Sequence, residues 1–253
     1  MGLFDFLKGK DKGKGKSAVS WALQRKIKKA LNKYVQAQER QGALSALVED
    51  NSDEAIKALL RRLTFLVEPL TTDETEKEYV ADSLIEKGPR IIPLLLESIK
   101  SSSSIMWQLN IYKELVSEEE LLQSLLAIMD AFDTEYEKDP QRKIQIIETL
   151  GEWKSTRVAG ALKRFLDDVD ETVRYQTVTS LLLQEPEIAR DWLLERALSD
   201  ESNRIRDLVI DGFVEKEVPI KGFHARKQFE EMLPADLHVD GKGLIKKKGP
   251  RAR

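Results

Sequence analysis

The side chains that could bind a metal gather in two short segments. Asp236, His238 and Asp240 alternate along a stretch that, if extended, would put them on one side. Nothing in this polar tail supplies the hydrogen-bonded outer groups that orient metal ligands, so we expect no site there. The run from Asp167 to Glu171 is acidic enough for Ca²⁺ but lacks the glycine and the terminal glutamate of a calcium loop. Helix capping explains this run better, and no metal or other cofactor is expected.

The sequence gives even less support for a catalytic nucleophile or a phosphate-binding loop. The chain has no cysteine, which excludes a thiol nucleophile, a thiolate metal site and a disulfide. Gly15-Lys16-Ser17 is similar to the end of a phosphate-binding loop, but Lys10 stands where that motif needs its first glycine, and no strand precedes it. We interpret this segment as a flexible linker of lysine and glycine. The sequence therefore predicts a protein that is not an enzyme.

Charge is distributed unevenly along the 253 residues. The chain has 41 Lys or Arg and 44 Asp or Glu, a net charge of −3. Residues 1–33 carry 10 basic and 2 acidic residues, residues 221–253 carry 9 and 4, and the part between carries 22 and 38. An acidic body between two basic ends favours phosphate or anionic-lipid contacts at the ends and disfavours them on the body.

The sequence gives no sign of a membrane or secreted location. No apolar run approaches the roughly 20 residues that span a bilayer. Residues 1–16 have no uninterrupted apolar region and no small-residue cleavage site. Phe6 also stands where a myristoylation signal has Ser or Thr. We therefore expect a cytoplasmic protein.

Helices are the elements that must position the charged side chains. Apolar residues recur at near-helical spacing, and no strand-like alternation of useful length precedes the C-terminal tail. Ser52 and Asp170 can cap helix N-termini, Ser117 and Glu120 fit a capping box, and Gly88 suits the left-handed end of a helix. After a first helix that contains Trp21, the expected segments are 40–49, 52–67, 73–87, 89–100, 103–116, 118–133, 140–153, 155–167, 170–184, 186–198 and 201–215.

The helices repeat. Lys143, Arg174 and Arg206 lie 31 and 32 residues apart, with matching apolar residues around them. An acidic residue precedes each of them by six positions: Glu137, Asp168 and Asp200. A period of this length, made of two antiparallel helices, is typical of an α-solenoid, because one helical hairpin cannot bury its apolar faces alone.

The segment from Leu150 to Asp168 resembles the HEAT repeat, in particular the short HEAT-like repeats of bacterial proteins (the type named after PBS lyases). The resemblance covers roughly 40–215 and implies an all-α fold, a right-handed α-solenoid of stacked antiparallel helix pairs. It also implies that an aspartate and the basic residue six positions later form a structural ladder between repeats. The residues so assigned are Asp168 with Arg174, and Asp200 with Arg206.

Some enzymes share the HEAT scaffold, so the fold by itself leaves function open. HEAT-like deoxyhypusine hydroxylases hold iron with repeated His-Glu pairs, whereas the two histidines here, His224 and His238, are not followed by Glu. HEAT-like DNA glycosylases need a basic concave surface, which the acidic body argues against. A lyase similar to the HEAT-like bilin lyases stays open, because that family has no universal motif.

Three parts are expected: a flexible basic N-terminal segment at 1–16, a HEAT-like solenoid at 17–232 and a basic tail at 233–253. The tail alternates around a turn at Asp240-Gly241 and could be a hairpin, a linear motif or a disordered end. Four tryptophans lie on apolar helix faces and are expected in the core, although an exposed one would be a candidate binding hot spot. They are Trp21, Trp107, Trp153 and Trp192.

The sequence thus predicts a non-enzymatic scaffold or adaptor that binds a macromolecular partner, with a protein preferred and no small-molecule substrate. Binding is expected on the face formed by successive second helices. An adaptor that binds nucleic acid or an anionic membrane through its basic ends is the first alternative, and a bilin-lyase-like enzyme is the second. The candidate partner-binding residues are Arg157, Lys163, Arg164, Arg190, Asp191 and Glu195.

Overall fold

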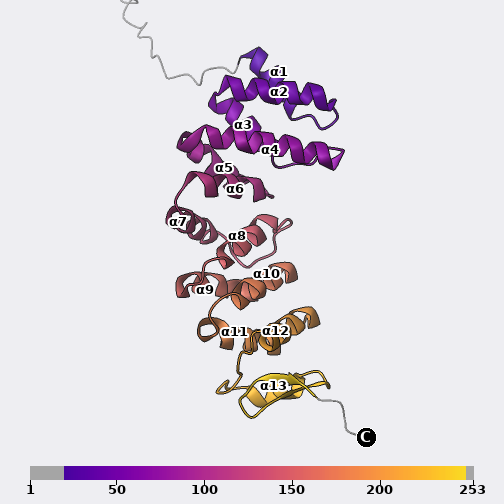
Figure 1. Ribbon diagram of the computed structural model, residues 1–253, viewed down its shortest axis with the longest axis vertical. Helices are drawn as coiled ribbons and strands as arrows, with labels where there is room; N and C mark the ends of the chain where they lie inside the picture. The colour runs from indigo at the N-terminus through magenta and orange to yellow at the C-terminus, as the bar shows by residue number, and fades with distance from the viewer. Residues whose placement is uncertain (1–19, 249–253) are drawn as a thin grey trace, which may run out of the picture. The chain divides into compact units, whose positions relative to one another are not determined.

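The computed structural model describes residues 20–248, and 68% of these are helical (Figure 1). The chain divides into two compact units, Met1–Ser98 and Ile99–Arg253. The predicted segment 1–16, Gly15-Lys16-Ser17 and the last five residues of the tail lie outside the described residues. The all-α class expected from the helical periodicity is confirmed.

The first unit is built from helices whose apolar faces meet in one core. α1 packs on α2 and α3, and α4 also packs on α2 and α3. Leu44, Ile56, Leu59 and Leu84 are fully buried there. The elements are α1 (Trp21–Ala30), α2 (Ala37–Asp50), α3 (Asp53–Arg62), α4 (Leu70–Glu86), the 3₁₀ helix η1 (Gly88–Ile91) and α5 (Ile92–Ser101), which runs across the boundary between the units.

Helix ends fall where the capping residues predict them. The Ser52 hydroxyl accepts the Ala55 N–H at 3.3 Å, and Ser117 forms the expected capping box with Glu120. Asp170 caps the helix that follows it. Gly88 has a φ of +68°, the left-handed conformation expected after the end of α4.

The second unit contains the repeating helices. α8, α10 and α12 pack side by side, α9 contacts α11, and α11 contacts α13, as Figure 1 shows for this unit. Segment 155–167, expected as one helix, is α9 followed by a 3₁₀ turn. The elements are α6 (Met106–Leu115), α7 (Glu118–Met129), α8 (Gln141–Gly151), α9 (Thr156–Lys163), η2 (Arg164–Asp167), α10 (Glu171–Leu182), α11 (Pro186–Ser199), α12 (Asn203–Glu215) and α13 (Arg226–Met232).

Two glycines allow the helices of this unit to approach closely. A Cβ on Gly151, at the end of α8, would lie 2.7 Å from the Cβ of Ser180 on α10. A Cβ on Gly212, on α12, would lie 2.7 Å from a methyl group of Leu182. Both distances are below any normal contact. At Gly151 the neighbour is the Cβ next to the α10 backbone, so the packing of α8 on α10 requires a residue without a side chain there, whereas at Gly212 the flexible end of Leu182 can move aside.

The C-terminal segment folds into a small hairpin, one of the three forms left open for the tail. β1 (Leu237–Val239) and β2 (Ile245–Lys247) pair antiparallel, and β2 packs on α12. The Asp240 carboxylate accepts the N–H groups of Lys242 and Leu244 and so closes the turn. None of the helices in residues 20–248 has the length and apolar character needed to cross a membrane.

Candidate functional site

A cluster of charged side chains is buried in the first unit, between α2, α3 and α4. The Arg40 Nε lies 2.8 Å from a Glu76 oxygen, and the Arg62 Nη2 lies 2.8 Å from Asp73 and 2.9 Å from Glu76. Lys77 completes the cluster, 2.8 Å from Asp73. Arg40 and Arg62 are 1% and 0% exposed, so each charge depends on the others for the hydrogen bonds that water would otherwise supply.

This ion cluster also anchors two loops. Arg40 donates to the Val35 carbonyl at 2.7 Å, in the connection between α1 and α2. Arg62 donates to the Phe65 carbonyl at 3.2 Å, and Asp73 accepts the Val67 N–H at 3.1 Å, both in the connection between α3 and α4. The buried charges therefore fix the backbone of the loops next to the exposed residues described below.

The electrostatics of the cluster keep its aspartate ionised. Burial by itself raises the pKa of Asp73, but the hydrogen bonds and charges of Lys77 and Arg62 outweigh it, and the net pKa is below the usual value. Both oxygens of Glu76 accept hydrogen bonds from guanidinium groups. Since these carboxylates are held by fixed cations, the arrangement serves structure and does not present a free acid or base.

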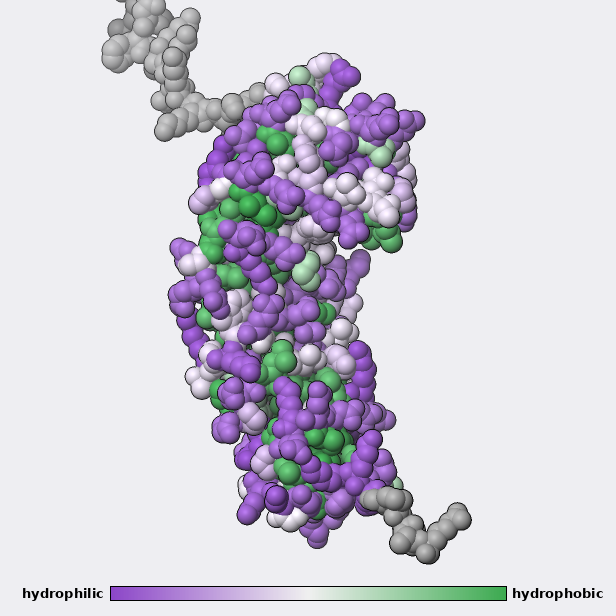
Figure 2. Space-filling view, viewed as in Figure 1, coloured by the Kyte–Doolittle hydropathy of each residue, from purple (hydrophilic) through white to green (hydrophobic). Residues whose placement is uncertain are grey.

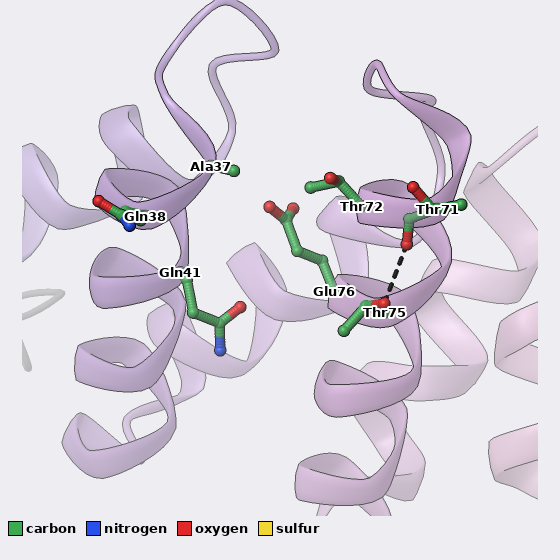
Figure 3. Close-up of a pocket in the computed structure, with 7 residues that line it drawn as sticks. All are labelled: Ala37, Gln38, Gln41, Thr71, Thr72, Thr75 and Glu76. Atoms are coloured by element: carbon green, nitrogen blue, oxygen red, sulfur yellow. Dashed lines mark hydrogen bonds between the residues drawn. The ribbon is translucent and has the colours of Figure 1, made fainter.

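Figure 3 shows a hollow between α2 and α4, directly above Glu76. It has a volume of about 450 Å³. Glu76 and Gln41 reach into it from opposite helices, while Thr75 donates to the Thr71 carbonyl on α4. The lining offers hydroxyl and amide groups, which suits hydrogen bonding to a small polar group or to water. The residues are Ala37, Gln38, Gln41, Thr71, Thr72, Thr75 and Glu76.

A larger hollow, of about 710 Å³, lies between α1, the loop after it and the end of α3. We call it the cationic groove. Its apolar lining comes from the half-buried Ile27, Leu31 and Phe65 and from the exposed Tyr34. Its charged lining is entirely basic and consists of the exposed residues Lys28, Lys33 and Arg61.

Large apolar side chains reach solvent around these hollows. Tyr34 is 84% exposed, Leu66 64% and Leu70 61%, and all three stand in or beside the two anchored loops. Trp21 is 72% exposed, so its predicted core position is wrong. It lies in the first turn of α1, where the Arg25 guanidinium covers its ring at 4.8 Å and no helix packs over it within the described residues. On the face of the molecule drawn in Figure 2, green hydrophobic residues lie among purple hydrophilic ones.

The predicted ladder residues of the second unit are buried and charged, but their pairing differs from the expected one. Arg174 binds the carboxylate of Asp200, at 3.0 and 3.2 Å, and not that of Asp168. Asp168 instead lies 3.0 Å from Lys143. Each basic side chain therefore reaches the carboxylate about 25 residues later, from the following repeat. Asp168, six positions before Arg174, contributes its backbone carbonyl to Arg174 at 3.0 Å, whereas Glu137, six positions before Lys143, has its carboxylate 3.9 Å from the Lys143 ammonium.

Arg206, the third of the repeated basic residues, binds a backbone carbonyl where Lys143 and Arg174 bind a carboxylate. Its Nε and Nη2 donate to the Asp200 carbonyl at 3.0 and 2.7 Å, while its Nη1 donates to Asn203. The predicted side-chain pair of Asp200 with Arg206 is thus a side-chain to backbone contact. The carboxylate of Asp200 is already held by Arg174 and by the Ser202 N–H, and Arg196 lies 2.9 Å from it.

These contacts shift two pKa values in the second unit. Burial raises the pKa of Asp200, but the hydrogen bonds from Arg174 and Ser202 and the charge of Arg196 outweigh it, so the net pKa is below the usual value. The hydrogen bond to Asp200 raises the pKa of Arg174. Both groups stay charged at neutral pH.

The predicted partner-binding residues lie on α9, η2 and α11 of the second unit, and α9 packs beside α11. Several of them are already engaged by neighbours. Arg157 donates to Gln123 at 2.7 Å, and Arg164 donates to the Met129 carbonyl. Arg190 pairs with Asp191 at 2.8 Å, and the Lys163 ammonium lies 4.6 Å from the centre of the Trp192 ring. Glu195 is exposed.

No group of three or more potential metal ligands comes together within residues 20–248. Asp240 serves the hairpin turn, and the exposed His238 lies on β1. Comparison with protein-family models, with curated proteins and with solved structures gave no match for this chain.

Proposed function

We propose that this chain is a non-enzymatic adaptor that binds a protein partner through exposed side chains of its first unit. The observation that carries the proposal is the buried ion cluster beneath exposed apolar residues. Arg40 holds the carbonyl of the residue after Tyr34, and Arg62 holds the carbonyl of the residue before Leu66. Tyr34 and Leu66 are themselves largely exposed. Because the backbone next to these residues is already held, less conformational entropy is lost when a partner buries their side chains.

The composition of this surface supports a protein partner. Tyrosine, tryptophan and arginine are the residue types that dominate the affinity of protein interfaces when a partner buries them. The exposed faces of α9 and α11 support it less, because Arg157, Arg164 and Arg190 are engaged within the unit.

We further propose that α8 to α12 are HEAT-like repeats that belong to a right-handed α-solenoid. The 31- and 32-residue period of Lys143, Arg174 and Arg206 supports this. The hydrogen bonds of Lys143 to Asp168 and of Arg174 to Asp200, one period further along the chain, support it as well. In such an array each repeat stabilises its neighbour, which suits a protein whose role is to present a surface.

Site-specific photo-cross-linking in the native host tests the adaptor proposal. A photoreactive amino acid replaces Tyr34, and in a matched control it replaces Tyr136, which is 78% exposed in the second unit. We expect a discrete adduct from position 34 whose added mass survives nuclease and lipid extraction, and none from position 136. Adducts from position 34 whose added mass nuclease or lipid extraction removes would contradict a protein partner.

A further inference from the structure

We infer that the cationic groove binds an acidic segment of a partner protein in which carboxylates flank one or two large apolar side chains. This inference rests on the proposed adaptor function and names the chemistry of the partner. It follows from the shape of the groove, its unpaired charges and the way its rim is held.

The groove has room and a surface for apolar side chains. Its volume of about 710 Å³ falls within the range of sites that enclose a ligand of several side chains' size. Ile27 on α1, Leu31 directly after α1 and Phe65 after α3 all line it, and all three are only half-buried. An apolar side chain that entered would remove this remaining apolar surface from water, which is favourable in proportion to the area buried.

Within residues 20–248, the charges of the groove have no anionic partner. Lys28, Lys33 and Arg61 form no ion pair with any of the described residues. Three other exposed cations of the same unit do form ion pairs, Lys29 with Glu39, Lys57 with Glu97 and Arg90 with Asp53, although Arg25 and Lys26 form none with the described residues. Three unpaired cations around one apolar floor give a local positive potential that attracts and orients carboxylates.

The rim of the groove is held in place before any partner binds. Tyr34 precedes Val35, whose carbonyl accepts from Arg40, and its own N–H donates to the Asn32 side chain at 2.9 Å. Phe65 is fixed by the hydrogen bond from Arg62 to its carbonyl. A rigid rim lowers the ordering cost of binding and favours a segment of defined pattern over any acidic chain.

A protein segment fits these observations better than a nucleic acid or a bilayer does. Single-stranded nucleic acid stacks successive bases on several aromatic faces, whereas Tyr34 is the one exposed ring among the described residues that line this groove and the half-buried Phe65 ring has Arg62 at 4.9 Å. Protruding side chains such as Tyr34 and Leu66 would reach a bilayer surface, but a bilayer would leave the hollow lined by Ile27 and Leu31 unfilled. A flexible peptide can place an apolar side chain inside the hollow and carboxylates at its rim.

The test is a selection of random peptides displayed on phage against the full-length chain, followed by fluorescence anisotropy with the selected peptides. The decisive variant carries Lys28→Glu, Lys33→Glu and Arg61→Glu. The control variant has the same change of net charge on exposed, unpaired lysines of the second unit: Lys138→Glu, Lys227→Glu and Lys247→Glu. A second groove variant replaces the three cations by Gln. Circular dichroism and thermal melting verify that each variant is folded.

We expect the selected peptides to be rich in Asp and Glu around Leu, Phe or Trp. Charge reversal in the groove should weaken their binding about tenfold or more, the Gln variant should weaken it less, and the control variant should bind as the wild type does. Binding should also weaken as salt is added.

Two results separate failure of this inference from failure of the proposed function. Peptides that bind the groove variants and the wild type equally would overturn the groove as their site and leave the adaptor proposal standing. An empty selection, together with groove-dependent binding to vesicles of equal parts phosphatidylcholine and phosphatidylglycerol or to a single-stranded oligonucleotide, would overturn both.

Discussion

At the scale of single residues, a buried charged side chain of this protein can bind more than one partner group. Arg174 binds the Asp200 carboxylate and also donates to the carbonyls of Asp168 and Val169. It therefore joins the loop of its own repeat to the carboxylate of the next. Because Arg174 and Asp200 are 6% and 0% exposed, losing either one leaves unsatisfied partners in a place that water does not reach.

We predict that Arg174→Ala lowers the free energy of unfolding by about 2–4 kcal/mol, since it strands the Asp200 carboxylate with fewer donors. Arg204→Ala is the matched control, because Arg204 pairs with Glu171 at 3.3 Å but is largely exposed. The control should cost less than about 1 kcal/mol. Urea denaturation followed by circular dichroism measures both, and equal losses would show that the burial of Arg174 has no energetic weight.

The lowered pKa of Asp200 predicts a pH dependence of stability. A carboxyl group whose folded pKa lies below its unfolded pKa stabilises the protein above the unfolded pKa, and this contribution disappears as pH falls through the folded pKa. Asp73, with the same direction of shift, acts in the same window. Stability should thus fall on the acid side, below the ordinary carboxyl pKa. Asp200→Asn should reduce that acid slope in denaturation curves measured at several pH values, and an unchanged slope would contradict the assignment.

At the scale of elements, the helices could be predicted well from the sequence, because the residues that cap the start of a helix act on nearby N–H groups. Ser117 with Glu120 and Asp170 each satisfy N–H groups within three residues, so their roles can be recognised without a fold. The ion cluster of Arg40 with Glu76 could not be predicted in this way, since the two residues are 36 positions apart. The pairing of Arg174 was misassigned for the same reason. Spacing identified the repeated positions, but only the packing of α10 decides which carboxylate the side chain meets.

The exposed site was only partly predictable. Trp21 was singled out as a hot spot if exposed, yet its apolar neighbours on α1 favoured the core. The cationic groove has no sequence signature, because Arg61 on α3 meets Lys28 and Tyr34 only after α1 and α3 pack together.

Close helix packing gives a prediction at this scale. Gly151→Ala should destabilise the second unit by about 1–3 kcal/mol, because the added methyl group overlaps Ser180 on α10 and forces the helices apart. Gly160 on α9 is the control, since a Cβ there meets nothing within 4 Å. Gly160→Ala should be neutral or stabilise by up to about 1 kcal/mol through helix propensity. Thermal melts of the two variants check this, and a stable Gly151→Ala protein would refute the close approach.

At the scale of the whole molecule, an acidic peptide could be bound either by the basic ends or by the cationic groove, and the two predict different effects of trimming the ends. If the groove carries recognition, removing residues 1–16 and 249–253 should leave the affinity for an acidic peptide unchanged. The C-terminal cut starts at 249 because residues up to 248 include β2, whose Ile245 is buried. Anisotropy titrations of full-length and trimmed protein at two salt concentrations measure this. Loss of peptide binding after trimming would move recognition to the ends of the chain.

We propose that buried charges stabilise this protein and that the exposed groove recognises its partner. Melting temperature and peptide affinity, measured for Arg174→Ala and for the charge-reversed groove variant of the full-length chain, separate these two roles. Arg174→Ala should melt at a lower temperature and bind the selected peptide as the wild type does. The groove variant should melt as the wild type does and lose binding. Unchanged melting with lost binding in Arg174→Ala, or full binding by the groove variant, would contradict these roles.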